Sequence, residues 1–114
     1  MHELSIALSI IELVREQALR SQALSIEEVE IEIGRLSGVE VETLTFALQS
    51  AVKDTMLERA RIVRRDIEGE GICGDCGVGF AVSGIFSPCP HCGSYAVRLI
   101  KGKELRVKSI IINK

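Results

Sequence analysis

The 114-residue chain has few aromatic residues, with no Trp, one Tyr and three Phe, and these make up 4% of its residues. Proteins that bind single-stranded nucleic acid rely on aromatic side chains on which bases stack. The net charge of −2 gives the chain no overall attraction for phosphate backbones. We therefore expect no nucleic-acid partner.

Long apolar runs are also absent, since none approaches the length of about 18 residues that a membrane-spanning helix needs. The first residues show no basic region followed by an apolar one, so we expect no secretory signal and no membrane association. A cluster of four cysteines in a reducing compartment favours a metal over disulfides. These observations together predict a cytoplasmic protein.

The four cysteines form two Cys-x-x-Cys pairs separated by twelve residues, Cys73/Cys76 and Cys89/Cys92. A gap of two residues lets a tight turn point both sulfurs of a pair at one ion, and two pairs complete the four-thiolate set that zinc(II) prefers. Because thiolates fill all four positions, no position is left for a catalytic water. The spacing therefore predicts a structural zinc site.

Other interpretations of the cysteines remain open. His91 lies inside the second pair and could replace one thiolate, but with four cysteines present we interpret it as a solvated or hydrogen-bonded side chain. Four thiolates also suit the iron of a rubredoxin-like electron carrier, which visible absorption would reveal. A thiol-disulfide enzyme is less favoured, because one metal site explains both pairs better than two redox sites do.

Hydrophobic periodicity outlines the rest of the fold. Spacings of three and four residues predict helices over residues 4–20 and from about 41 to near Met56, the second opened by a capping box formed by Ser37 and Glu40. Alternating or β-branched segments predict strands over residues 28–35, 60–70 and 104–112. The sequence thus predicts a mixed α/β fold, with two helices covering one face of a three-stranded mixed sheet and a four-cysteine subdomain inserted into it.

Charged residues accompany two of the predicted strands. Alternation places Glu28, Glu30 and Glu32 on one outward face, which we interpret as solvated. The arginines of residues 59–65 are typical of a strand edge protected against aggregation, with docking of an acidic partner as the alternative.

The first three residues, Met1, His2 and Glu3, can form a nickel site. The imidazole and backbone amide of His2, together with the terminal amine of Met1, offer three nitrogens, and the amide of Glu3 offers a fourth. Nickel(II) suits such a square-planar nitrogen set better than zinc(II) does. Glu3 could instead contribute its carboxylate, and a lone histidine near a terminus is more often a solvated residue.

Three motifs taken together favour the nickel site over a solvated histidine. They are the start Met1-His2-Glu3, the segment Ile33–Glu40, and the two cysteine pairs in this order. In this combination the chain resembles the HypA-type hydrogenase maturation proteins over nearly its whole length. The resemblance implies a nickel metallochaperone that is not an enzyme. Such a protein passes nickel(II) to the precursor of a [NiFe]-hydrogenase large subunit with the help of a HypB-type GTPase.

The same resemblance implies the ligands and the domains. Nickel, as cargo, falls on His2 with Met1 and Glu3, and structural zinc falls on Cys73, Cys76, Cys89 and Cys92. The nickel-binding domain would comprise residues 1–70 and 102–114, and the zinc-binding subdomain residues 71–101. The expected oligomeric state is a monomer or a weak homodimer. The alternative function is a zinc-ribbon adaptor for nucleic acid or protein that delivers no nickel.

Overall fold

The computed structural model describes residues 3–84 and 86–114 of the chain, which divide into two units. The first unit comprises residues 1–32, 39–65 and 106–114, and the second residues 33–38 and 66–105. Among the described residues, neither helix has both the length and the apolar character needed to cross a bilayer. The elements in chain order are α1 Glu3–Arg20, β1 Ser25–Gly34, α2 Val41–Ala51, β2 Arg61–Ile67, β3 Glu70–Cys73, β4 Gly79–Ala81, β5 Val97–Lys101 and β6 Leu105–Asn113.

Helix α1 forms where the periodicity predicts it, but the prediction that Leu4 and Leu8 belong to its apolar face is wrong, since they are 55% and 52% exposed. Its buried residues recur every three or four positions, and the stripe ends at Ala18, two residues before the helix does. Gln22 then adopts a left-handed conformation with φ of 59°. This lets the amide of Ala23 donate to the carbonyl of Ala18 at 2.9 Å, so the last turn is capped by its own backbone.

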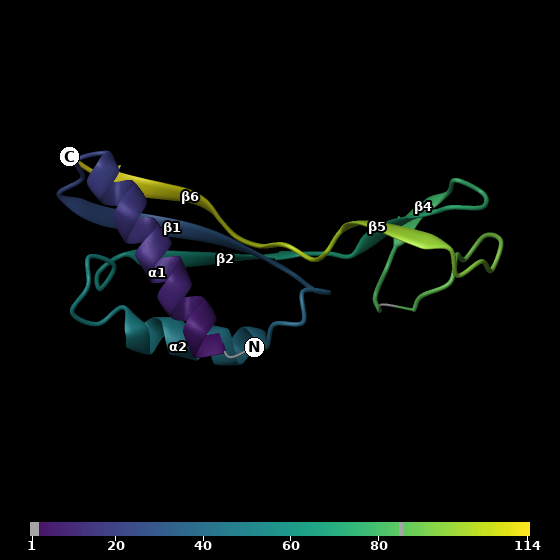
Figure 1. Cartoon of the computed structure of the whole chain (residues 1–114), viewed down its shortest axis with the longest axis horizontal. Coiled ribbons are helices and arrows are strands. Elements are labelled where there is room, and N and C mark those ends of the chain that lie inside the picture. The colour runs from purple at the N-terminus through teal and green to yellow at the C-terminus, as the bar shows by residue number, and fades with distance from the viewer. Residues whose placement is uncertain (1–2, 85) are drawn as a thin grey trace. The chain divides into compact units, whose positions relative to one another are not determined.

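The first unit contains a sheet with the strand order β2-β1-β6, and both helices lie on the same face of this sheet (Figure 1). The order of the ion pairs across the sheet shows the relative directions of its strands. Glu28 pairs with Arg61 and Glu30 with Arg65, so the contacts advance in the same direction along β1 and β2, which are parallel. Lys108 also pairs with Glu30, whereas Arg106 pairs with Glu32, so β6 runs antiparallel to β1. The predicted fold of two helices on a three-stranded mixed sheet is confirmed.

Helix α2 is shorter than the sequence predicts. It ends at Ala51, and the prediction that it continues to about Met56 is wrong. After the helix, Asp54 takes a φ of 63°, and the hydroxyl of Thr55 donates to the carbonyl of Val52 at 2.6 Å, so the chain turns instead of continuing the helix. This turn places Leu57, which is fully buried, in the core.

The predicted capping box at the start of α2 is also wrong. The N-cap of the helix is Glu40, and no side chain of the cap forms a capping hydrogen bond. Gly38 has a φ of 81°, and the chain turns there before the helix begins. A carboxylate from the other helix takes part instead: Glu3 Oε2 accepts a hydrogen bond from the Glu40 amide at 3.2 Å. Negative charge at a helix N-terminus is favourable, so Glu3 links the start of α1 to the start of α2.

The core of the first unit lies between the helices and the sheet. Leu44 from α2 and Leu57 from the following turn are fully buried, and Val14, Val29 and Ile31 are no more than 1% exposed. On the solvent side of α2, Phe46 is 70% exposed only two residues from Leu44. The same helix therefore offers both a core position and a matched surface position.

Replacing Leu44 by Ala should lower the free energy of unfolding by about 2 to 5 kcal/mol, because it removes buried methyl groups and leaves a cavity. Phe46→Ala, which removes a larger but exposed side chain, should change this free energy by no more than about 0.5 kcal/mol. Urea denaturation followed by the helical circular dichroism signal measures both. Equal losses in the two variants would contradict this placement of the core.

The opposite face of the sheet carries a layer of charge pairs. The side chains of Glu28, Glu30 and Glu32 are only 18%, 14% and 9% exposed, so the prediction that they form a solvated face is wrong. Arginines from both neighbouring strands lie over them, and Arg65 lowers the pKa of Glu30 by donating a hydrogen bond to its carboxylate at 2.7 Å. Most of the exposed charge on this face therefore belongs to the cations.

The second unit contains an antiparallel sheet with the strand order β4-β3-β5. The predicted strand over residues 60–70 is interrupted before this sheet, since β2 ends at Ile67 and β3 begins at Glu70. Between them, the Gly69 carbonyl accepts a hydrogen bond from the Val82 amide at 2.9 Å, and a Cβ at Gly69 would lie 2.1 Å from the Val82 carbonyl oxygen. The close approach of two backbones therefore requires glycine where the sequence indicated a continuous strand.

Candidate metal centre

Two turns of the same design carry the four cysteines. In the first, the amide of Cys73 donates to the Val78 carbonyl at 2.9 Å, and the amide of Gly77 donates to the Cys73 carbonyl at 3.0 Å. The second repeats this pattern sixteen residues later, with Cys89 bonded to the Ser94 carbonyl and Gly93 to Cys89, both at 2.8 Å. Gly77 and Gly93 both have a φ of 78°, a conformation that favours glycine.

Gly74 serves a different purpose from these two glycines. It does not have a positive φ; instead its amide donates to the Ala96 carbonyl at 2.6 Å. A Cβ at this position would lie 2.9 Å from that carbonyl oxygen. The first turn is therefore held against the chain that leads from the second turn into β5.

The turns bring the four predicted sulfurs to one place. The Sγ atoms of Cys73 and Cys92 lie 3.5 Å apart, those of Cys76 and Cys89 lie 3.6 Å apart, and all four lie within 4.8 Å of one another. Zinc–sulfur bonds of about 2.3 Å in a tetrahedron place the sulfurs about 3.8 Å apart. The two short separations each join sulfurs from different turns, which favours one shared metal site over two separate Cys-x-x-Cys redox pairs. The arrangement fits a closed, structural zinc site.

The electrostatics of the cluster show why it suits a cation. The backbone N–H of Cys76 lowers the pKa of the Cys73 thiol to about 6, whereas the pKa of Cys92 rises to about 12, because the other sulfurs and burial outweigh the N–H of Ser94. Burial raises the pKa of Cys89, but backbone N–H groups lower it further. The N–H of Val78 lowers the pKa of Cys76, yet burial and the neighbouring sulfurs raise it overall. In each close pair one thiol therefore ionises more readily than the other, and a divalent cation would favour ionisation of all four.

Backbone and side-chain groups around the cluster orient the sulfurs. The amides of Asp75 and His91 each donate to the first cysteine sulfur of their own turn at 3.4 Å. The Ser94 hydroxyl donates to Asp75 Oδ2 at 2.5 Å, and this bond joins the two turns directly. Sequence analysis missed Asp75 and Ser94. Their polar side chains, inside the first turn and directly after the second, were the available signal.

The cluster found among the described residues consists of the four cysteines alone. The side chain of His91 is exposed, as expected for a residue outside the ligand set. Cys73 and Cys89 are each 2% exposed, while Cys76 and Cys92 face the solvent. Each turn thus contributes one buried and one exposed thiolate to the site.

The predicted nickel ligands Met1 and His2 lie outside the described residues. Glu3, the third predicted residue, is described and begins α1. Its carboxylate contacts the amide of Glu40, a residue that sequence analysis had assigned only to a capping box.

Fold and site together define a small mixed α/β metalloprotein whose second unit is built around a closed four-thiolate zinc site. The sequence matches the family described as "Hydrogenase/urease nickel incorporation, metallochaperone, hypA" over residues 1–112. The chain therefore belongs to the HypA family of nickel metallochaperones, and the resemblance found in the sequence is confirmed.

Relatives and solved structures agree with this assignment. The chain is 64% identical to the hydrogenase maturation factor HypA of Parabacteroides distasonis over 114 residues, covering 100% of this chain and 99% of that protein. It is 44% identical to the factor of the same name from Prosthecochloris aestuarii, covering 98% and 99%. The solution structure of the Ni metallochaperone HypA from Helicobacter pylori is similar with a TM-score of 0.70 at 29% identity, covering 99% of this chain and 98% of that one.

Proposed function

We propose that this protein binds nickel(II) at its N-terminus and delivers it to the precursor of a [NiFe]-hydrogenase large subunit, working with a HypB-type GTPase in the cytoplasm. Membership of the nickel metallochaperone family supports this proposal, and the sequence Met1-His2-Glu3 supplies the donor atoms. In this role the protein is a carrier and not an enzyme.

The contact between Glu3 and Glu40 is the observation that bears most directly on the nickel ligands. Because the Glu3 carboxylate already accepts a hydrogen bond from Glu40, we assign to nickel the backbone amide of Glu3 and not its carboxylate. The amine of Met1 and the amide and imidazole of His2 complete a four-nitrogen set, which suits the square-planar preference of nickel(II). The imidazole and the amine have reference pKa values of about 6.5 and 7.7 to 8.0, so nickel affinity should fall as the pH drops through this range.

The two metals then have separate functions. Zinc, held by four thiolates, stabilises its own part of the chain, for which we retain the assignment of residues 71–101 as the zinc-binding subdomain. Residues 1–70 and 102–114 form the nickel-binding domain in this proposal. A nickel site made from the first residues of a chain can be opened by a partner more readily than a closed cage, as a delivery protein requires.

Nickel titration of tag-free protein, with bound zinc counted in parallel, tests this proposal. We expect one nickel per chain, and His2→Ala should weaken nickel binding at least 100-fold while zinc stays at one per chain. A matched variant with one glycine inserted between Met1 and His2 keeps every side chain but separates the amine from the imidazole. It should weaken nickel binding as well.

Delivery is tested by mixing nickel-loaded protein with the large-subunit precursor and the GTPase. The natural sequence should transfer nickel and His2→Ala should not. In the titration, equal nickel binding by the natural protein, His2→Ala and the glycine-insertion variant would remove His2 from the mechanism. It would make a zinc-ribbon adaptor the better interpretation of the fold.

A further inference from the structure

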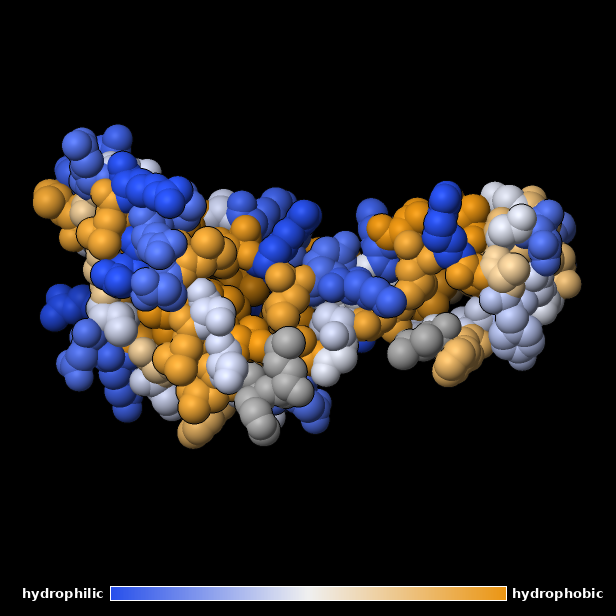
Figure 2. All heavy atoms as spheres, in the orientation of Figure 1, coloured by the Kyte–Doolittle hydropathy of each residue, from blue (hydrophilic) through white to orange (hydrophobic). Residues whose placement is uncertain are grey.

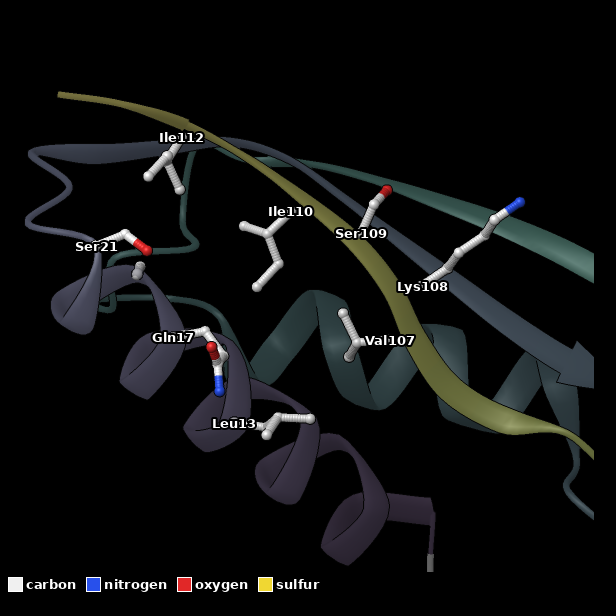
Figure 3. A pocket seen from close by; sticks show the side chains of 9 residues that line it. Leu13, Gln17, Ser21, Val107, Lys108, Ser109, Ile110 and Ile112 are labelled. Atoms are coloured by element: carbon white, nitrogen blue, oxygen red, sulfur yellow. The ribbon is translucent and has the colours of Figure 1, made fainter.

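The most reactive side chains of this protein lie away from its open apolar groove. Apolar side chains gather at the surface beside α1 (Figure 2). A groove of about 430 Å³ lies between α1 and β6, where Leu13, Gln17 and Ile110 line it (Figure 3). Among the residues that line this groove there is no cysteine, histidine or carboxylate. The strongest nucleophiles of the chain, its four cysteines, lie instead in the second unit.

The four sulfurs differ in their access to solvent. Cys73 and Cys89, the first cysteine of each turn, are each 2% exposed, whereas Cys76 and Cys92 are exposed. With zinc bound, all four are thiolates, the form of cysteine that reacts with oxidants. Susceptibility to oxidation follows thiolate character and exposure. A small oxidant in solution therefore meets the second cysteine of each turn first.

Each exposed sulfur is in contact with a buried sulfur of the other turn. The Cys92 sulfur lies 3.5 Å from that of Cys73, and the Cys76 sulfur lies 3.6 Å from that of Cys89. A disulfide needs its sulfurs about 2.0 Å apart, so each pair has to close by about 1.5 Å. The hydrogen bond from Ser94 to the carboxylate of residue 75 joins the two turns. Bonds between the turns can therefore form without either turn being rebuilt.

We propose that the four-thiolate site is also a site of oxidation by hydrogen peroxide, which converts it into two disulfides between the turns, Cys73–Cys92 and Cys76–Cys89, and releases zinc. In each pair the exposed thiolate attacks one peroxide oxygen, the O–O bond breaks, hydroxide leaves, and a sulfenic acid forms. The buried thiolate then attacks that sulfur, and a second hydroxide leaves as the S–S bond forms. Two molecules of peroxide thus accept the four electrons that the four thiolates give up.

Zinc leaves because its ligands are consumed. After the first disulfide only two thiolates remain, whereas a structural zinc site holds its ion with four ligands. The connectivity also distinguishes this chemistry from that of a Cys-x-x-Cys redox enzyme, which joins the two cysteines of one turn. A dithiol reductant supplied together with zinc should return the protein to its starting state.

Mass spectrometry of zinc-loaded, tag-free protein, treated with hydrogen peroxide and then alkylated, provides the test. Chymotrypsin cleaves after Phe80 and Phe86, which lie between the two turns in the sequence. Disulfides between the turns leave the two cysteine peptides joined, whereas disulfides within the turns leave them separate. We expect joined peptides with the two proposed pairings, one zinc released per chain to a colorimetric chelator, and no more than two peroxide molecules consumed.

The same protein in guanidinium and chelator is the matched control. Pairing in the unfolded chain no longer follows the folded distances, so disulfides within each turn should form as well and separate peptides should appear. In the folded protein, disulfides within the turns or with the other cross-turn pairing would overturn the proposal. Sulfinic or sulfonic acids at Cys76 and Cys92 without a disulfide would also overturn it, as would unchanged thiols with zinc retained. The test uses no nickel, so its outcome is independent of the proposed delivery function.

Discussion

Cys73→Ser should abolish zinc binding and unfold most of the region from residue 66 to 105, while the helices of the first unit persist. The reason is that the second unit has little apolar core of its own. Among its described residues from 66 to 105, the buried hydrophobic side chains are Val82 and the ligands Cys73 and Cys89. The binding free energy of structural zinc is about 10 to 16 kcal/mol in zinc-finger peptides, and here too it should act as folding free energy.

Amide NMR spectra, recorded with zinc counted in the same samples, measure this effect. Signals from β3, β4 and β5 should collapse into the unfolded region in Cys73→Ser, and a strong chelator should produce the same change in the natural protein. His91→Ala is the matched control, because His91 lies in the second turn with an exposed side chain and should leave zinc bound. Dispersed signals from β3 in a zinc-free protein would show that the metal is not needed for folding.

Gly34→Ala should destabilise the protein by at least about 4 kcal/mol, a loss outside the usual range for one substitution. A Cβ at Gly34 would lie 2.0 Å from the Gly102 carbonyl oxygen and 2.7 Å from the Glu104 amide nitrogen. Both are backbone atoms, and the Gly34 amide itself donates to the Glu104 carbonyl at 2.7 Å. The segments around Gly34 and Glu104 therefore cannot move apart to make room for the Cβ without losing the hydrogen bond that joins them.

Gly79→Ala is the matched control for this prediction. Gly79 begins β4, does not have a positive φ, and a Cβ there would come no closer than 3.9 Å to its nearest neighbour. Thermal unfolding should separate the two variants clearly, with a large fall in Tm for Gly34→Ala and little change for Gly79→Ala. Similar values of Tm would mean that the backbones at residues 34 and 102 do not pack this closely.

Sequence patterns predicted the larger elements well, because each depends on the period of its own buried residues. The buried residues of α1, which end at Ala18, and the alternation from Val29 to Ile33 are local signals. The errors arose where residues far away in the sequence determine the local structure. Residue 82 interrupts the strand at Gly69, and the Glu3 carboxylate replaces the predicted capping box at Glu40.

The candidate metal centre was predictable for the same reason, since each cysteine pair closes a local turn. The hydrogen bond between Asp75 and Ser94 was not, because it joins two turns whose approach only the folded chain establishes. The burial of Glu28, Glu30 and Glu32 was missed likewise. Strand alternation gives the face of a residue but does not reveal which side chains from neighbouring strands will cover it.

The charge layer on the open face of the sheet constrains how this surface can evolve. Each half-buried glutamate of β1 depends on a cation from β2 or β6, so losing Arg61 or Arg106 alone would leave a carboxylate partly desolvated without its partner. Replacing both members of a pair by apolar residues of similar size removes that penalty. In diverging relatives, the positions of Glu28 and Arg61, and those of Glu32 and Arg106, should therefore change together and seldom one at a time.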